Sequence, residues 1–253
     1  MIQTIMDICH FEKFGYGPMA LLFGAFAGGG WTIAYIDMIR IGIKQKTYGM
    51  PMVALALNIV WEVMYATLYW LQDGKWPGGY MMALVNTIWV LFDFGILYTH
   101  FKYGKKDFIK YAPQKYFVPW TIMSIIMAIC IQYGFYAVFD IAGNGYTAIL
   151  QNIPMSMLYI FLLFSRKSTE GQTMLIAIGK MVGTLGATIA IMVYMWDILN
   201  ILGGLLCFMF DMVYIVLLYK QFKAEGKNPW KPCSPLVREP DLSKAPTTLS
   251  VVV

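Results

Sequence analysis

The chain contains seven apolar stretches, each long enough to cross a lipid bilayer as a helix. They cover approximately residues 18–40, 51–71, 79–101, 116–139, 146–165, 172–195 and 198–222. A membrane-spanning helix needs about 20 mostly apolar residues to cross a hydrocarbon core about 30 Å thick. Only 13% of the 253 residues are charged, which is about half the share found in soluble domains. The pattern predicts an all-α polytopic membrane protein, a bundle of seven transmembrane helices, and excludes an ordinary soluble enzyme.

Basic residues mark alternate breaks between these stretches. Sixteen of the 19 Lys and Arg residues lie in the first, third and fifth breaks or after residue 219, whereas the opposite side has only Lys13 and Lys75. Because basic loops are retained in the cytosol, we expect a lumenal N-terminus and a cytosolic C-terminus, in the endoplasmic reticulum. The net charge of +5 is then a topology signal, and we expect the lipid bilayer, not nucleic acid, as the partner.

Three segments follow from this division of the chain. We expect a lumenal N-terminus over residues 1–17, a seven-helix membrane domain over 18–222 and a disordered cytosolic tail over 223–253, where prolines recur among polar residues. The first 17 residues have no basic region followed by an apolar run and a cleavage site, so the first span would act as the targeting signal. A possible capping box, Thr169 to Gln172, begins the sixth span.

Several kinds of catalytic centre have no motif in this chain. The four cysteines are scattered and only two histidines exist, so we expect no zinc site and no disulfide framework. The sequence also contains no acidic D-D-x-x-D cluster, no H-E-x-x-H, no G-x-S-x-G and no phosphate-binding loop. We therefore expect neither a metal nor another cofactor.

Four ionisable residues lie inside the predicted spans, where each costs a few kcal/mol: Glu62, Asp93, Lys180 and Asp211. With a rise of ~1.5 Å per residue, all four lie ~12 to ~16 Å from the cytosolic end of their span. They therefore share one layer, and Asn58 joins them because it is one helical turn from Glu62. Three acids and one base leave unmatched charge, which favours a polar cavity over a purely structural network.

Aromatic residues lie within one turn of two of these acids. Trp61 and Tyr65 accompany Glu62, and Phe210 and Tyr214 accompany Asp211. We expect these four to contact a substrate. Other aromatic residues within the spans are interpreted as packing or interfacial residues: Trp31, Tyr35, Trp89 and Tyr98.

Five segments together resemble a known family. They are KTYGM at 46–50, NIVWEVMY at 58–65, DFGILY at 93–98, RKSTEG at 166–171 and FDMVY at 210–214. This combination resembles the small seven-span terpene cyclases of fungal meroterpenoid and indole-diterpene biosynthesis, over roughly residues 20–222.

The resemblance implies acid-initiated, metal-independent cyclisation of an epoxidised prenyl chain on an aromatic or indole acceptor. The family's two acidic residues correspond to Glu62 and Asp211, and Asn58, Trp61, Tyr65, Asp93, Phe210 and Tyr214 would then bind a hydrophobic prenylated substrate. The chemistry agrees, since burial disfavours the anion of a carboxyl group and so keeps an acid available. Two alternatives stay open: a proton-coupled transporter that uses the Glu, Asp and Lys cluster, and a structural or receptor-like protein with a buried ion-pair network.

Overall fold

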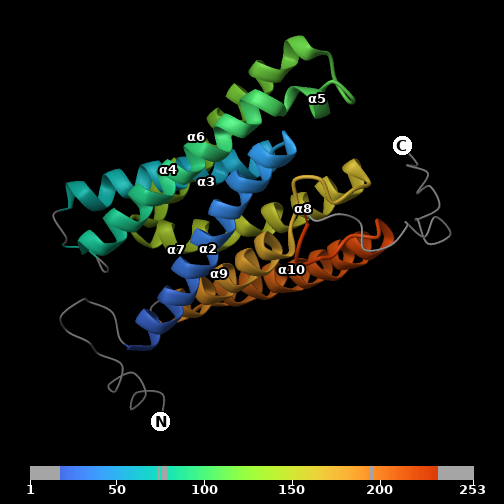
Figure 1. Ribbon diagram of the computed structural model, residues 1–253. Helices are drawn as coiled ribbons and strands as arrows, with labels where there is room; N and C mark the ends of the chain where they lie inside the picture. The colour runs from blue at the N-terminus through green and yellow to red at the C-terminus, as the bar shows by residue number, and fades with distance from the viewer. Residues whose placement is uncertain (1–17, 73–74, 76–78, 194–195, 233–253) are drawn as a thin grey trace.

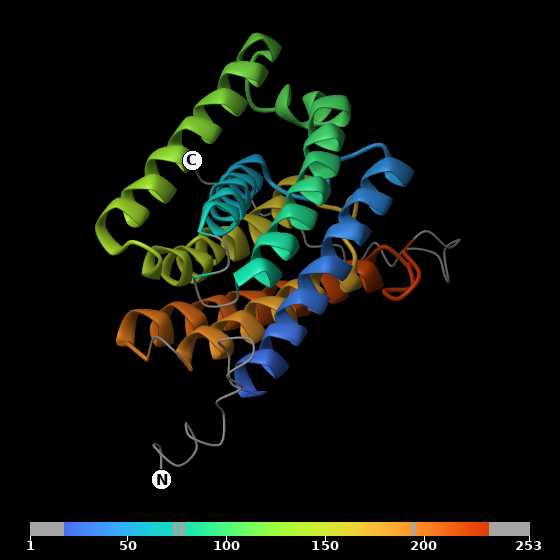
Figure 2. The same cartoon turned by 90° about the vertical axis from the view of Figure 1, so that its left-hand side faces the viewer.

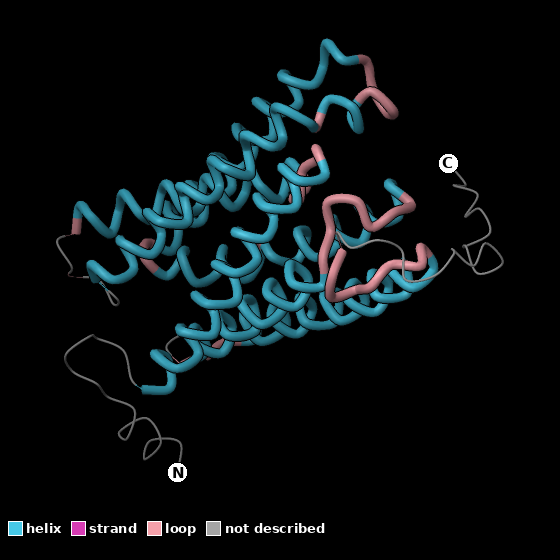
Figure 3. Tube along the Cα trace, viewed as in Figure 1, coloured by secondary structure: helices cyan, strands magenta, loops and turns pink. Residues whose placement is uncertain are grey.

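The computed structural model describes residues 18–72, 75, 79–193 and 196–232 (Figure 1). Within them it contains helices and connecting turns, and no strand (Figure 3). Seven segments of this described part are long and apolar enough to cross a membrane: Leu22–Gln45, Met52–Leu71, Gly79–Tyr103, Gln114–Phe139, Ala142–Arg166, Met174–Met192 and Ile198–Ala224. The predicted all-α fold with seven spans is confirmed.

The seven spans are formed by eight helices. These are α2 (Pro18–Gln45), α3 (Met52–Leu71), α4 (Gly79–Tyr103), α6 (Phe117–Phe139), α7 (Ala142–Leu150), α8 (Asn152–Arg166), α9 (Met174–Met192) and α10 (Ile198–Ala224). The short α5 (Lys105–Phe108) and the 3-10 helix η1 (Gln114–Tyr116) connect α4 to α6. Below, the two ends of the bundle are named after the ends of α2, the Pro18 end and the Gln45 end.

Helix α3 has the most protein-enclosed position in the bundle. It packs against α4, α6, α7 and α8 (Figure 2), and 67% of its span is buried inside the protein. Helix α2 packs against α4 and α9, while α10 packs against α8 and α9. Because lipid cannot solvate a carboxyl group, α3 is the helix best able to carry a glutamate at mid-membrane depth.

Glycines allow α2 and α9 to approach closely. A Cβ atom on Gly30 would lie 2.6 Å from the carbonyl oxygen of Gly179, and one on Gly183 would lie 2.6 Å from Cδ1 of Trp31. Small residues at helix contacts are typical of membrane bundles, where close backbone packing stabilises association. This contact sets the position of α2 along the axis of α9.

The fifth span differs from its prediction. It begins at Ala142, not near residue 146, and it is divided into α7 and α8 at Gln151. Pro154 lies in the first turn of α8 and has no N–H to donate back to the preceding turn, which explains the break in the helix. The Gln151 side chain accepts a 2.9 Å hydrogen bond from Nε2 of Gln132, which ties the break to α6.

The sixth span also begins differently from the prediction. Its cap is Thr173, whose hydroxyl oxygen accepts a hydrogen bond from the backbone N–H of Ile176. Thr169 instead binds Glu225 beyond the end of α10, through both its N–H and its hydroxyl at 2.7 Å. The predicted capping box is therefore wrong, because Thr169 belongs to the loop before the helix. The segments predicted as 1–17 and most of the tail, 233–253, lie outside the described residues.

Two of the family-like segments meet at the Gln45 end. The guanidinium of Arg166 lies over the ring of Tyr48, 4.3 Å from its centroid, and donates to Asp107 at 3.0 Å. Burial disfavours the Asp107 anion, but the hydrogen bond from Lys110 and the charge of Arg166 outweigh it, so the pKa of Asp107 lies below its usual value. This cluster joins three loops and lies apart from the acids inside the spans.

Candidate active site

The first buried polar cluster joins α2, α3 and α4. Tyr35 donates its hydroxyl to Oε1 of Glu62 at 2.6 Å. The amide nitrogen of Asn58 lies 2.7 Å from the Tyr35 hydroxyl, 3.0 Å from Oε1 of Glu62 and 2.9 Å from Oδ2 of Asp93. Glu62 and Asp93 are both 0% exposed. One amide therefore holds two carboxyl groups from neighbouring helices, and we call these four residues the Glu62 cluster.

A second cluster joins α8, α9 and α10. Lys180 donates from Nζ to Oδ1 of Asp211 at 2.7 Å and to the hydroxyl of Ser156 at 2.6 Å. Lys180 is 0% exposed, so it does not reach the bilayer surface. Its partner is Asp211, and we call these three residues the Lys180 cluster.

Each carboxyl group of these two clusters keeps one oxygen atom to which no hydroxyl, amide or ammonium group donates. Among the described residues, these atoms are Oε2 of Glu62, Oδ1 of Asp93 and Oδ2 of Asp211. An unpartnered polar atom away from water is costly, so such atoms in a native interior are candidates for contact with a ligand or a bound water. These three carboxyl oxygens inside the spans are therefore candidate contacts for a bound ligand.

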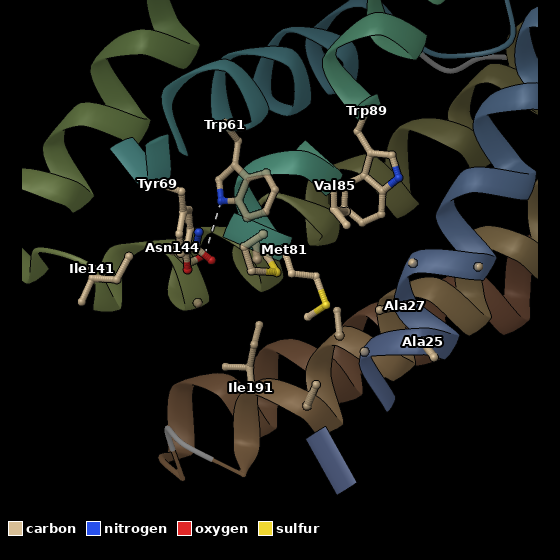
Figure 4. A pocket seen from close by; sticks show the side chains of 18 of the residues that line it. Ala25, Ala27, Trp61, Tyr69, Met81, Val85, Trp89, Ile141, Asn144 and Ile191 are labelled. Atoms are coloured by element: carbon tan, nitrogen blue, oxygen red, sulfur yellow. Dashed lines mark hydrogen bonds between the residues drawn. The ribbon is translucent and has the colours of Figure 1, made fainter. Parts of the chain in front are cut away.

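A large apolar pocket lies at the Pro18 end of the bundle. Its volume is about 660 Å³, within the range of pockets that hold small-molecule ligands. Side chains from α3 and α4 face those from α2 and α9 across it (Figure 4). The lining residues are Gly24, Ala25, Ala27, Gly28, Gly29, Trp61, Tyr69, Met81, Met82, Val85, Trp89, Ile141, Ala142, Asn144, Gly145, Ala148, Ala187, Ala190 and Ile191.

The pocket wall lies beside the Glu62 cluster. Trp61 precedes Glu62 on α3 and its indole N–H donates to the carbonyl of Asn144 at 3.4 Å (Figure 4). Trp89 packs edge-on against Tyr35 with ring centroids 5.9 Å apart, and Tyr35 is the donor to Glu62. Trp61 is therefore the sequence neighbour of the buried acid Glu62, and Trp89 is connected to Glu62 through Tyr35.

Of the eight residues predicted for the site, Trp61 alone is in the pocket lining. Asn58, Glu62 and Asp93 form one hydrogen-bonded cluster behind the wall, as their shared depth predicted. Asp211 belongs to the other cluster. We had expected Glu62, Asp93 and Asp211 to face one shared cavity. None of the three lines this pocket.

The predicted aromatic residues have different surroundings. Tyr65 is buried and packs against Trp61, with ring centroids 5.4 Å apart. Tyr214 packs against Tyr159 and donates to Gln172 at 3.0 Å, toward the Gln45 end. Phe210 is half-buried and is not in the pocket lining. Among the predicted aromatic residues, Trp61 and Tyr65 thus have the closest relation to the pocket.

Sequence reasoning missed Tyr35 as a member of the site. The first span was predicted to end at residue 40, but α2 continues to Gln45. With the observed end, Tyr35 lies ~15 Å from the Gln45 end, which is the depth calculated for Glu62. The correct helix end would have placed Tyr35 in the layer of acids.

Comparison with known proteins identifies the family. A family model described as Pyr4-like transmembrane terpene cyclases matches residues 15–224. Terpene cyclase ascF of Acremonium egyptiacum is 40% identical over 88 residues, 35% of this chain and 29% of that protein. The Pyr4-family terpene cyclase mfmH of Annulohypoxylon moriforme is 28% identical over 174 residues, 67% of each chain. Terpene cyclase pyr4 of Aspergillus fumigatus is 24% identical over 243 residues, 86% of this chain and 91% of that protein.

No solved structure matches the chain. The match to ascF covers less than a third of that relative, but the family model covers all seven described spans and both buried clusters. The resemblance predicted from the motifs is confirmed, and the chain belongs to the Pyr4-like transmembrane terpene cyclases.

Proposed function

We propose that this chain is a membrane-embedded terpene cyclase that protonates a terminal epoxide on a prenyl chain. The prenyl chain would be carried by an aromatic or indole acceptor, as in meroterpenoid and indole-diterpene precursors. One observation carries the proposal: Glu62 is fully buried, has donors on one oxygen only, and lies behind the wall of an apolar pocket. The relatives described above are all terpene cyclases, which supports the reaction class.

The hydrogen bonds of Glu62 favour a proton donor of defined orientation. Its Oε1 accepts from Tyr35 and Asn58, so a proton on the neutral acid belongs on Oε2. No hydroxyl or amide group of the described residues donates to that oxygen, and the carboxyl groups of Glu62 and Asp93 also interact with each other. Asp93 lies on the other side of the same Asn58 amide. Since two neighbouring carboxylates in a low-dielectric medium repel one another, at least one of the pair is favoured as the neutral acid.

The reaction begins with transfer of this proton to the epoxide oxygen. The C–O bond to the more substituted carbon breaks, its electron pair stays on oxygen, and a carbocation forms. Neighbouring alkenes then attack in sequence, and loss of a proton or capture by an acceptor oxygen ends the cascade. Trp61, Tyr69 and Trp89 line the pocket, and aromatic faces of this kind stabilise a passing cation. Product and substrate have the same mass.

Asp211 has a different proposed role from Glu62. Oδ1 of Asp211 is held in a 2.7 Å ion pair with the ammonium group of Lys180, whereas the donors to Glu62 are the neutral side chains of Tyr35 and Asn58. We therefore assign the initiating proton to Glu62, and assign to Asp211 the stabilisation of positive charge or the acceptance of the final proton through Oδ2.

The pocket suits a lipid-soluble substrate. Its lining is almost entirely apolar, and a dry site protects a carbocation from water. At Gly24, Gly28 and Gly29 no atom lies within 4 Å of an added Cβ, which leaves room beside α2 for a prenyl chain that enters from the bilayer. This chemistry requires no metal or other cofactor.

We infer the orientation of the protein in the membrane from the loops that carry most of the Lys and Arg residues. We propose that the Pro18 end and residues 1–17 are lumenal, that residues 18–222 form the membrane domain, and that the tail over 223–253 is cytosolic, in the endoplasmic reticulum. The pocket would then occupy the lumenal half of the membrane, with the Glu62 cluster at its inner end.

An isomerisation assay tests the reaction. Membranes that contain the protein are incubated with an epoxidised farnesyl phenol, and we expect a product of unchanged mass and new retention time. Glu62→Gln keeps the size of the side chain and the Oε1 acceptor but cannot donate an acidic proton. We expect it to lower the rate by ~10²–10⁴-fold or more, the usual contribution of a general acid.

Protein level and membrane insertion should stay normal in this variant. Val63→Ala, a change to the exposed neighbour of Glu62, serves as the control and should retain the wild-type rate. Near-normal product formation by Glu62→Gln would refute the proton-donor role and favour a structural polar network. Proton-coupled uptake of the compound without isomerisation would favour a transporter.

A further inference from the structure

Asn86 is a buried amide without a hydrogen-bond partner. It lies on α4, is 0% exposed, and neither its side-chain nitrogen nor its oxygen has a partner among the described residues. Other buried amides of the bundle have at least one partner: Asn58 contacts Tyr35 and the two acids, and Gln132 donates to Gln151. Leaving an amide unpaired in an apolar interior costs about 1–3 kcal/mol, so Asn86 requires an explanation other than folding.

The position of Asn86 relates it to the pocket. Met82, Asn86, Trp89 and Asp93 follow one another at three- or four-residue spacing on one face of α4. Met82 and Trp89 line the pocket, as does Val85, the residue before Asn86. Asn86 therefore sits between two pocket-lining residues, on the face that carries the acid Asp93.

The position of Asn86 relative to Glu62 follows from helix packing. Helices α3 and α4 are antiparallel neighbours, and their register is fixed by the hydrogen bond from Asn58 to Asp93. Counting from that pair, Trp89 lies level with Glu62, and Asn86 lies ~4.5 Å further toward the Pro18 end, at a rise of ~1.5 Å per residue. A ligand atom near Oε2 of Glu62 would therefore lie at nearly the same height in the bundle as this amide.

The chemistry of the amide selects the kind of group that it can hold. An amide offers two N–H donors and one carbonyl acceptor. An epoxide oxygen only accepts hydrogen bonds, but the hydroxyl that forms when the epoxide opens both donates and accepts. The Asn86 amide matches the hydroxyl better than the epoxide, and contacts that strengthen along the reaction accelerate it.

We propose that Asn86 binds the substrate oxygen that Glu62 protonates and holds it as the hydroxyl produced by ring opening. This inference rests on the proposed function. The Asn86 N–H group donates to the oxygen as the C–O electron pair moves onto it, and the Asn86 carbonyl accepts the hydroxyl hydrogen. The prenyl chain then extends from this oxygen along the apolar wall of the pocket.

Asn86→Leu tests the proposal, because leucine has a similar size and no polar atom. The free protein should keep or raise its Tm in detergent, since no protein hydrogen bond is lost and an unpaired buried amide is removed. The kcat for the epoxidised farnesyl phenol should fall by about 10²-fold, as on loss of one donor to developing charge. Thr87→Val, on the same helix, is the control, because its hydroxyl donates to the carbonyl of Ala83 and accepts from the indole of Trp70 and so already has protein partners, unlike Asn86; it should keep the wild-type kcat.

A binding measurement separates this inference from the reaction itself. The probes are a hydrogenated farnesyl phenol with a secondary hydroxyl on the carbon that keeps the epoxide oxygen, and the same compound without that hydroxyl; neither can cyclise. Fluorescence of the pocket tryptophans Trp61 and Trp89 reports their binding. We expect wild-type protein to bind the hydroxylated probe about 10-fold more tightly, a difference of about 1.4 kcal/mol, and Asn86→Leu to bind both equally.

The outcomes distinguish the two proposals. An active wild type, an inactive Glu62→Gln and an unchanged Asn86→Leu overturn the role of Asn86 alone. A large fall in the Tm of Asn86→Leu with the probe preference retained would make Asn86 a structural residue and also overturns this role. Equal binding of both probes by the wild type overturns it as well. If the wild type forms no isomer but prefers the hydroxylated probe through Asn86, the reaction is wrong and the oxygen-binding role stands.

Discussion

The Asn58 amide contacts both carboxyl groups of the Glu62 cluster. Its nitrogen and the Tyr35 hydroxyl both contact Oε1 of Glu62, so we expect a proton on the neutral acid to be carried by Oε2. A side chain that only filled space between α3 and α4 could not do this. We therefore regard Asn58 and Tyr35 as positioning residues, which orient the acid without contacting the substrate.

The Lys180 cluster allows a prediction about buried charge. Lys180→Met removes the partner of Asp211 and leaves an unpaired carboxylate in the bundle, so we expect a loss of about 3–5 kcal/mol of stability. The double variant Lys180→Met, Asp211→Leu should recover much of this loss, because it removes both charges. The measurement is the Tm of the detergent-solubilised protein.

The activity of the double variant separates folding from chemistry. It should remain inactive although it folds, because Asp211 is absent. A double variant with wild-type turnover contradicts a chemical role for Asp211, and a single variant with unchanged Tm contradicts the buried ion pair.

The ionisable residues that belong to the buried clusters could be predicted from the sequence at this scale, but their pairing could not. Counting residues from the span ends placed Glu62, Asp93, Lys180 and Asp211 in one layer, and the structure pairs all four within two clusters. The count has no information on the rotation of each helix about its axis. That rotation decides that Lys180 meets Asp211 and not Asp93, and it leaves Asn86 without a partner.

At the scale of the elements, the glycine contact between α2 and α9 sets how closely these two helices pack. Gly30→Ala brings a Cβ within 2.6 Å of backbone atoms of Gly179 and Gly183, which cannot rotate away. We expect α2 and α9 to move apart and the protein to lose about 1–3 kcal/mol of stability, as in other overpacked contacts. Gly134→Ala is the matched control on α6, where nothing lies within 4 Å of the added Cβ.

The control should gain up to about 1 kcal/mol, because alanine favours a helix more than glycine does. Thermal unfolding in detergent measures both variants. Equal Tm values for Gly30→Ala and Gly134→Ala would contradict the close contact of α2 and α9.

Span number follows from apolar length, whereas span ends depend on tertiary contacts. The first span was predicted five residues too short because Arg40 was taken as its end, and Arg40 is in fact paired with Asp37 inside α2. The break at Gln151 was not predicted either. A proline near the start of an apolar stretch is compatible with a continuous span, and the interaction of Gln151 with Gln132 on α6 is a contact that no local pattern contains.

On the scale of the whole molecule, the Gln45 end is held by charged side chains outside the spans. Burial would raise the pKa of Glu225, but hydrogen bonds from Lys227, Thr169 and Gln221 lower it below its usual value. The pKa of Asp107 is also lowered. Groups with a lowered folded-state pKa contribute stability above their unfolded pKa of about 4 and lose it as the pH falls through the folded pKa.

Thermal unfolding at a series of pH values tests this prediction. We expect the Tm of the wild type to fall as the pH is lowered from 5 to 3, a window set by the unfolded pKa of about 4. Asp107→Asn should be less stable at pH 7 and show a smaller fall. A Tm that is independent of pH in both proteins would contradict the role of Asp107 in joining these loops.

Topology is the broadest prediction, because it decides on which side of the membrane the pocket lies. An odd number of spans puts the start of α2 and the end of α10 at opposite ends of the bundle (Figure 1). The loops at the Gln45 end carry the basic residues, including Arg166 and Lys106, and such loops stay in the cytosol. A glycosylation-acceptor tag should therefore be modified when fused before Met1 and remain unmodified when fused after Val253. Modification of the C-terminal tag alone would reverse the orientation and move the pocket, with its access from the bilayer, to the cytosolic leaflet.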